Sequence, residues 1–234
     1  WSKDVVASWT EKQQIKQLTR AEREKLAALT PGQQAVIRES EALSSDPFRG
    51  AVERRVMPDD MLSSQMETAA AEAAIKDSGI PRDQIDLLLV QSVAPDFLHV
   101  PNACAVHRNL GLKKNCHSVA VDLVCNSFLQ ELSLAEAYIR AGRAKYALIV
   151  QSANFSRFAD WKSQGSAWFG DGAAAAVIGP VKDGEGVLGI ANATHGYHYG
   201  VLVTGVPGGR WYDGKPQVYV PNLEGLRLQF MNIP

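Results

Sequence analysis

The stretch Asp122-Leu-Val-Cys-Asn-Ser-Phe128 joins two segments of different character. It follows a β-prone apolar run at 117–121 and opens a segment, 126–142, in which apolar residues recur at helical spacing. Cys125 is therefore expected at the junction between a buried strand and the N-terminus of a helix. The unpaired N–H groups and partial positive charge of a helix N-terminus stabilise a thiolate, which is the reactive form of cysteine.

The local sequence leaves two interpretations of Cys125 open. A stabilised thiolate would make it a nucleophile that carries an acyl group. A free cysteine is equally well known as a small buried hydrophobic residue. The predicted helix itself rests on four apolar residues that share one face: Phe128, Leu132, Ala135 and Ile139.

Composition excludes several classes of protein. The 234 residues are 46% hydrophobic, which is enough for the core of one large domain or two small ones. The net charge is −1, from 24 basic and 25 acidic residues. The sequence contains no basic stripe with interleaved aromatics, so a nucleic-acid partner is not predicted. No apolar run approaches the roughly 20 residues that cross a bilayer, so no membrane partner is predicted.

The cysteines and histidines indicate a reduced protein without a metal site. Three cysteines, an odd number with no CxxC spacing, are typical of a cytoplasmic protein. Among the five histidines, His195 and His198 are three residues apart, but no third ligand is close to them in sequence. We therefore expect loop histidines and no bound metal.

Residues 61–150 alternate between helical and strand patterns. The apolar run Leu87-Leu-Leu-Val90 is typical of a strand buried on both faces of a parallel sheet. The predicted order is helix from 61, strand 86–93, helix 101–110, strand 117–123, helix 126–142 and strand 146–150. This alternation predicts an α/β fold, with a parallel or mixed sheet covered by helices.

The flanking segments divide the chain. Residues 1–47 are predicted to be a helical N-terminal extension, with a capping box at 19–22, a break at Pro31-Gly32 and a second helix at 33–43. Residues 48–234 form the second predicted domain. Beyond residue 150 it is expected to contain strands at 173–178 and 187–193 and a Gly/Pro-rich loop at 205–216.

Six segments occur in an order and spacing that match a known family. They are 50–55, 78–86, 100–112, 122–128, 169–173 (Phe-Gly-Asp-Gly-Ala) and 195–200. Together they resemble the N-terminal half of the thiolase superfamily, specifically its ketoacyl-ACP synthase III-like branch. The resemblance runs from about residue 48 to the C-terminus, and it implies the N-terminal half of the αβαβα thiolase architecture.

This resemblance implies a ketosynthase-type acyltransferase of fatty-acid, polyketide or secondary metabolism. Cys125 sits where the family has its nucleophile, which takes an acyl group from a thioester. A malonyl-type extender then loses CO₂ and attacks the acyl-Cys125. The donor is an acyl-coenzyme A or acyl-carrier protein, and no cofactor is implied.

The resemblance also implies substrate-binding residues, for which ordinary packing is the alternative. Three residues lie in the segment that, in the family, reaches toward the neighbouring subunit's acyl pocket: Phe97, Leu98 and Val100. Trp161 and Trp168 could line the same channel, and Arg49 lies beside a position that binds coenzyme A. The family's other coenzyme A contacts fall near Ser44 and Ser163. We therefore expect altered coenzyme A binding and an acyl donor that arrives on a carrier protein.

The family completes its site with a histidine and an asparagine from a second half of similar size. None of the five histidines here corresponds to that histidine. We therefore expect the second half to be on another chain or this sequence to be a fragment of a longer protein, and a partner or tight dimer to cover an apolar face. Two alternatives remain: a non-catalytic or half-site subunit of a heteromeric ketosynthase-like complex, and acyl transfer to a hydroxyl or amine without decarboxylation.

Overall fold

The computed structural model describes residues 2–12, 28–42, 48, 50–97, 99–157, 159, 161, 164–198, 202–205 and 227–230. The chain forms two compact units: residues 1–54 with 160–169, and residues 55–159 with 170–234. The described part of the first unit contains α1 (Lys3–Lys12), α3 (Pro31–Ala42) and the short η4 (Gln164–Trp168). The second unit contains the main sheet, and Cys125 belongs to it.

Helix α3 begins at the Pro31-Gly32 pair. The Thr30 N–H donates to Gln33 Oε1 at 2.9 Å, and the Gln33 N–H donates to Thr30 Oγ1 at 3.4 Å, which is a capping box. Proline is tolerated at the first helical position because that N–H has no intrahelical partner. The predicted boundary is therefore confirmed as the start of α3. The helix predicted before it falls mostly outside the described residues. The capping box predicted at 19–22 lies outside the described residues.

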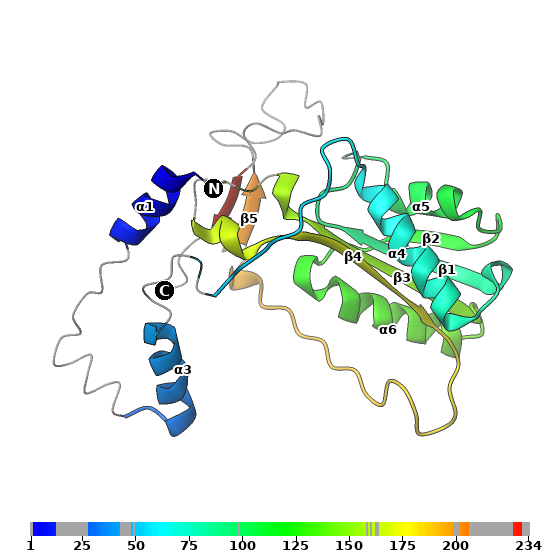
Figure 1. Cartoon of the computed structure of the whole chain (residues 1–234). Coiled ribbons are helices and arrows are strands. Elements are labelled where there is room, and N and C mark those ends of the chain that lie inside the picture. Colours follow the sequence, from blue (N-terminus) through cyan, green and yellow to red (C-terminus); the bar gives the residue numbers. More distant parts are fainter. Residues whose placement is uncertain are drawn as a thin grey trace. The chain divides into compact units, whose positions relative to one another are not determined.

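The main sheet has four strands in the order β2-β1-β3-β4 (Figure 1). They are β1 (Ile85–Ser92), β2 (His117–Ala120), β3 (Tyr146–Asn154) and β4 (Asp171–Ile178). β1 pairs in parallel with β2 and β3, and β4 pairs antiparallel with β3. The predicted mixed sheet is confirmed, because the first three strands are joined by helical crossovers and β4 follows β3 without one.

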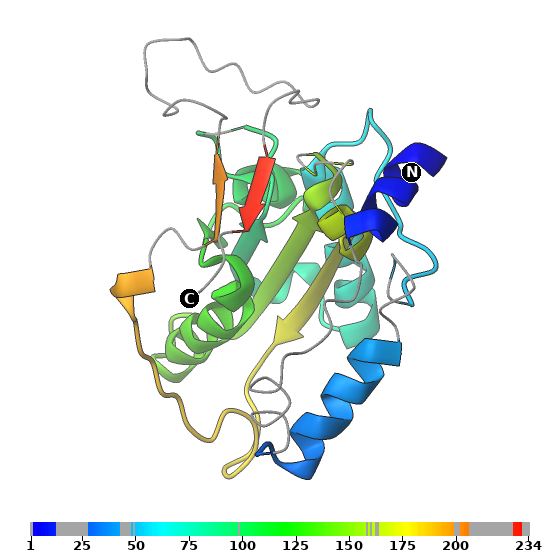
Figure 2. The ribbon, with the colours of Figure 1, turned by 90° about the vertical axis from the view of Figure 1, so that its left-hand side faces the viewer.

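Helices cover both faces of this sheet (Figure 2). α4 (Ser63–Ser78) and α5 (Asn102–Leu110) pack on Leu88, Val90, Leu148 and Val150. α6 (Ser127–Arg140) packs on Leu87, Leu89 and Ile149 of the other face. Because successive strand residues point to opposite faces, the whole Leu87–Val90 run is buried, as the sequence predicts.

Two predictions beyond residue 170 have different outcomes. The strand at 173–178 is confirmed as β4, which starts two residues earlier. The strand at 187–193 is wrong: these residues have no regular structure, and Leu188 is 80% exposed. Gly184 and Gly186 precede this run and Gly189 lies within it, and glycine disfavours strands because it loses the most backbone entropy on folding.

A second, two-stranded sheet is formed by β5 (Leu202–Gly205) and β6 (Arg227–Phe230), which pair antiparallel. The loop predicted at 205–216 begins at the last residue of β5 and otherwise lies outside the described residues. None of the helices in the described part of the chain combines the length and apolarity needed to span a membrane.

Candidate active site

Cys125 lies at the carboxyl edge of the main sheet. β2 pairs with β1 up to Ala120, and the Val121 N–H continues the pairing by donating to the Val90 carbonyl at 3.0 Å. The chain then enters the 3₁₀ turn η2 (Val124–Asn126), which leads directly into α6. Cys125 is exposed in this turn, which joins a strand to a helix as the sequence predicts. The strand was expected to be buried, and this is wrong: β2 lies at the edge of the sheet, and its residues are exposed or half-buried. Ligands of open α/β sheets bind at this edge of the sheet.

Hydrogen bonds fix the backbone on either side of Cys125. The Leu123 N–H donates to Ser127 Oγ at 2.8 Å, and Ser127 is fully buried in the first turn of α6. The Val124 N–H donates to Asp122 Oδ1 at 3.1 Å, which is a local turn of the Asx type. The position of the cysteine backbone is therefore tied to the start of α6.

The residue before the cysteine has an unusual backbone conformation. Val124 has φ 51°, and no other non-glycine residue in the described ranges has a positive φ. A β-branched side chain is a clear outlier in this left-handed region, at a cost of roughly 1–2 kcal/mol. Such local strain clusters at functional sites, where the surrounding structure maintains it.

Replacement of Val124 by glycine is expected to raise the free energy of unfolding by about 0.5–1 kcal/mol, since glycine adopts this φ without strain. The valine side chain is 53% exposed, so little burial is lost. Urea unfolding measures the change. Leu123→Gly is the control because Leu123 has φ −130°, and we expect it to lower stability. An equal loss of stability in both variants would contradict the backbone strain at Val124.

The three cysteines differ in their surroundings. Cys116 is buried, and this burial raises the pKa of its thiol to about 11, so it is a poor nucleophile at neutral pH. Cys104 is exposed and lies in the first turn of α5. Geometry alone therefore leaves Cys104 and Cys125 as the two candidates for an accessible thiol near a helix N-terminus.

The predicted substrate-binding residues divide between the two units. Phe97 and Val100 are 59% and 57% exposed, and they lie in the connection between β1 and α5. They follow the carboxyl end of β1, which is the strand beside β2, so they belong to the same edge of the sheet as Cys125. Trp161 and Trp168 are exposed in the first unit. Leu98, Arg49, Ser44 and Ser163 lie outside the described residues.

Large apolar side chains surround the cysteine turn and are exposed. They are Leu123 (48%), Val124 (53%), Phe128 (42%) and Leu129 (63%). The sequence pattern places Phe128 on one face of the helix together with Leu132. Leu132 packs on the sheet, but Phe128 lies in the first turn, beyond the end of the α6-facing core. A group of exposed apolar residues of this kind marks a binding or interaction surface.

Two fully buried glutamates were missed by sequence reasoning. Glu67 of α4 accepts hydrogen bonds from Ser92 Oγ (2.5 Å), Ser152 Oγ (2.6 Å) and Asn102 Nδ2 (3.0 Å). Glu131 of α6 accepts one from Gln151 Nε2. Burial raises the pKa of both carboxyl groups. The available signal was the polar pair Gln-Ser that recurs at 91–92 and 151–152, near the carboxyl ends of β1 and β3.

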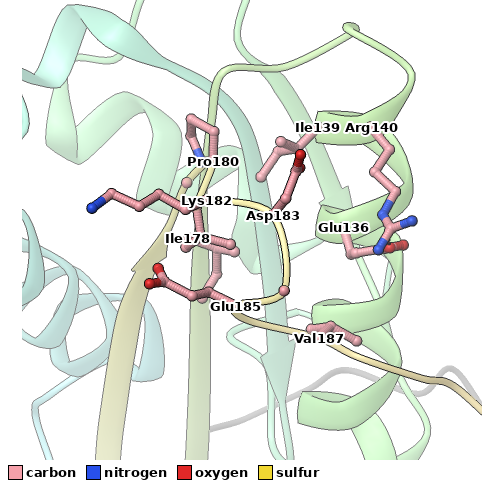
Figure 3. A pocket seen from close by; sticks show the side chains of 12 residues that line it. Glu136, Ile139, Arg140, Ile178, Pro180, Lys182, Asp183, Glu185 and Val187 are labelled. Atoms are coloured by element: carbon pink, nitrogen blue, oxygen red, sulfur yellow. Dashed lines mark ion pairs between the residues drawn. The ribbon is translucent and has the colours of Figure 1, made fainter.

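A cavity of about 410 Å³ lies at the C-terminal half of α6, so it is at the opposite end of this helix from Cys125. It is bounded by Ile139 and the ion pair Glu136–Arg140 on one side and by residues 178–187 on the other (Figure 3). Its charged lining carries both signs. Within the described ranges, no group of three or more His, Cys, Asp or Glu is placed to hold a metal ion.

Comparisons with known proteins show which family this part of the chain resembles. A sequence profile of the family described as 3-oxoacyl-[acyl-carrier-protein (ACP)] synthase III matches residues 120–196. The β-ketoacyl-[acyl-carrier-protein] synthase III of Bacillus pumilus (strain SAFR-032) is 37% identical over 140 residues, which are 59% of this chain and 45% of that protein. Over this part of its length the chain is similar to the synthase III family. The segment that the family profile matches in this synthase III-like chain, residues 120–196, includes Cys125.

Solved structures agree with this assignment. The β-ketoacyl-[acyl-carrier-protein] synthase III of Thermus thermophilus is 28% identical, with a TM-score of 0.64 over 78% of this chain and 54% of that chain. The priming β-ketosynthase of the R1128 polyketide biosynthetic pathway is also 28% identical, with a TM-score of 0.59 over 64% and 45%. The predicted thiolase-like fold is thus confirmed. The synthase III-like chain spans about half the length of the relatives it matches.

Proposed function

We propose that this chain carries the nucleophile of a ketosynthase-type acyltransferase and that Cys125 is the residue that is acylated. The observation that supports the proposal is an exposed cysteine in the turn between β2 and α6, inside the segment that matches the synthase III family. The first turn of α6 directs its N–H groups and the positive end of the helix dipole toward this turn. Both favour the thiolate.

The first step is transfer of an acyl group. The Cys125 thiolate attacks the carbonyl carbon of an acyl thioester, and a new C–S bond to Cys125 forms. The bond to the carrier sulfur breaks, and the carrier leaves as a thiol after taking up a proton. The oxyanion formed on the way needs an N–H donor, and the backbone amide of Cys125 is the donor we assign.

The second step forms a carbon–carbon bond. A malonyl-type extender loses CO₂, and the electron pair of the broken C–C bond attacks the acyl carbon on Cys125. The Cys125 thiolate is then released, and a β-ketoacyl thioester is formed. Because the chain spans about half of its relatives, the groups that bind the extender are proposed to come from a second half or second subunit.

The binding surfaces follow from the same proposal. Phe97, Leu98 and Val100, with Trp161 and Trp168, are assigned to the acyl channel, and Arg49 to the donor. The exposed apolar residues around Cys125 are assigned to contact with the missing half or with a dimer partner. The donor is proposed to arrive on an acyl-carrier protein in the cytoplasm, and residues 1–47 are proposed to form a helical extension to the thiolase-like part.

Intact-mass measurement with a panel of acyl-coenzyme A and acyl-carrier-protein thioesters tests the proposal. We expect one acyl adduct, formed faster from the carrier protein, that is absent in Cys125→Ser. Cys104→Ser is the matched control, because Cys104 is also exposed in the first turn of a helix, and it should be loaded like the unaltered protein. Loading that survives Cys125→Ser, or no adduct with any donor in the full-length protein, would refute it.

A further inference from the structure

The two buried glutamates lie on opposite faces of the sheet near the carboxyl ends of β1 and β3. Gln91 and Ser92 of β1 are paired in register with Gln151 and Ser152 of β3. The serines point toward α4 and bind Glu67, whereas Gln151 points toward α6 and binds Glu131. The carboxylate of Glu67 is satisfied by three donors, but that of Glu131 has one.

Glu131 and Gln91 carry polar atoms that are buried without partners. Glu131 is fully buried and Gln91 is 4% exposed. Within the described residues, neither Glu131 Oε1 nor Gln91 Nε2 has a hydrogen-bond partner. Gln91 lies beside Gln151 on the strand face that carries Leu87 and Leu89, which is the face covered by α6. The two orphan atoms therefore belong to the same layer between α6 and the sheet.

Protonation of Glu131 allows these two unpaired groups to form a hydrogen bond with each other. Burial raises the pKa of the carboxyl group to about 8, and the hydrogen bond from Gln151 opposes this rise. A neutral carboxyl group has one O–H to donate. The nitrogen and oxygen of a glutamine amide exchange places by a half-turn of the side chain, so the amide oxygen of Gln91 can accept that hydrogen bond. With that bond, neutral Glu131 would join α6 to β1 through Gln91, in addition to the observed bond to β3 through Gln151.

The charged and titratable groups on the neighbouring elements are engaged elsewhere. In β1, Asp86 binds Lys113, and in β4, Asp171 binds Met57 and Ser156. Tyr146 begins β3, at the end of the strand opposite to Gln151. Glu136 and Arg140 of α6 form an ion pair, Tyr138 of α6 contacts His117, and η2 carries Cys125. Burial and Gln151 are accordingly the two causes of the altered pKa of Glu131.

We propose that Glu131, in its neutral form, is a positioning residue that fastens the N-terminal part of α6 to β1 and β3 and so holds the Cys125 turn in place. The mechanical link is short, because Ser127 lies one helical turn before Glu131 and its Oγ accepts the Leu123 N–H. This inference rests on the proposed role of Cys125, but it concerns the reactivity of the thiol and not the condensation reaction.

Ionisation of Glu131 should disturb the thiol in two ways. A negative charge on a buried carboxyl group with one hydrogen-bond donor is destabilising, so the attachment of α6 to the sheet weakens. The new negative charge also lies on α6, the helix into which the Cys125 turn leads, and it repels the negative sulfur that attacks the reagent. Both effects reduce the reactivity of Cys125 as the pH rises through about 8.

The test is the rate of Cys125 alkylation by iodoacetamide, resolved from Cys104 by peptide mass, between pH 6.5 and 9.5 in the full-length protein. Glu131→Gln imitates the neutral acid. We expect it to react like the unaltered protein below pH 7 and at least about threefold faster above pH 9. The ratio of the two rates removes the pH dependence of alkylation that the two proteins share. Glu136→Gln, on the same helix, is the matched control and should give a constant ratio to the unaltered protein.

A second variant keeps Glu131 and changes its partner. Gln151→Leu removes the hydrogen bond that lowers the pKa of Glu131, so the midpoint of the pH effect should move to higher pH. A rate ratio for Glu131→Gln that is flat across this pH range, or an unmoved midpoint in Gln151→Leu, would overturn the inference. If the rate ratio for Glu131→Gln changes with pH but the protein accepts no acyl group, the proposed function is refuted and this inference stands.

Discussion

Replacement of Cys125 by alanine is expected to lower condensation by the full-length protein about 10³-fold or more, because removal of a covalent nucleophile removes the acyl intermediate. Binding of donor and extender should be retained, since the side chain is small and lies in a turn fixed by the Leu123–Ser127 and Val124–Asp122 hydrogen bonds. The measurement is formation of the β-ketoacyl product together with release of CO₂ from a labelled extender.

The same assay includes a control variant and distinguishes the competing functions. Cys104→Ala should retain the rate of the unaltered protein, because Cys104 lies outside the segment that matches the family. An unchanged rate in Cys125→Ala would identify a non-catalytic subunit whose partner performs the chemistry. An ester or amide product without CO₂ release, lost in Cys125→Ala, would keep the acylated cysteine but reject the decarboxylative step.

The fold of the central part was predictable because its sequence signals are strong and local. The uninterrupted run Leu87–Val90 is hydrophobic on both faces, and a strand with that pattern needs helices on each side. The turn at Cys125 was predictable for the same reason, since a β-prone run changes to helical spacing within a few residues. These features depend on neighbours in the sequence, which a pattern can capture.

Other features depend on contacts between distant residues. Phe128 has helical spacing, but whether that position is buried is decided by how far the sheet extends beneath the first turn of α6. Residues 187–193 have β propensity, but in the described part of the chain no strand pairs with them. The left-handed φ of Val124 contradicts the preference of valine and is imposed by the surrounding hydrogen bonds.

The buried glutamates are the clearest case of a feature that depends on contacts between distant residues. Glu67 gives the largest expected effect on stability. Glu67→Ala should lower the free energy of unfolding by about 4 kcal/mol or more, because it leaves a cavity and three unpaired donors, from Ser92, Ser152 and Asn102. Denaturant unfolding measures this change. Glu72→Ala on the same helix is the matched control: Glu72 pairs with Arg82 at the surface, and its loss should cost less than about 1 kcal/mol.

The pH dependence of that loss tests the protonation state of Glu67. Burial is the largest cause that raises the pKa of Glu67 above its ordinary value of 4.5, against the hydrogen bonds from Ser152, Ser92 and Asn102. Between the ordinary and the raised pKa, the folded protein keeps a proton that the unfolded chain has released. The stability contributed by this group is therefore full below pH 4.5 and falls as the pH rises, by at most about 1.4 kcal/mol per pH unit. The penalty of Glu67→Ala should shrink with rising pH, whereas a penalty that grows with pH would mean that Glu67 is held as a carboxylate.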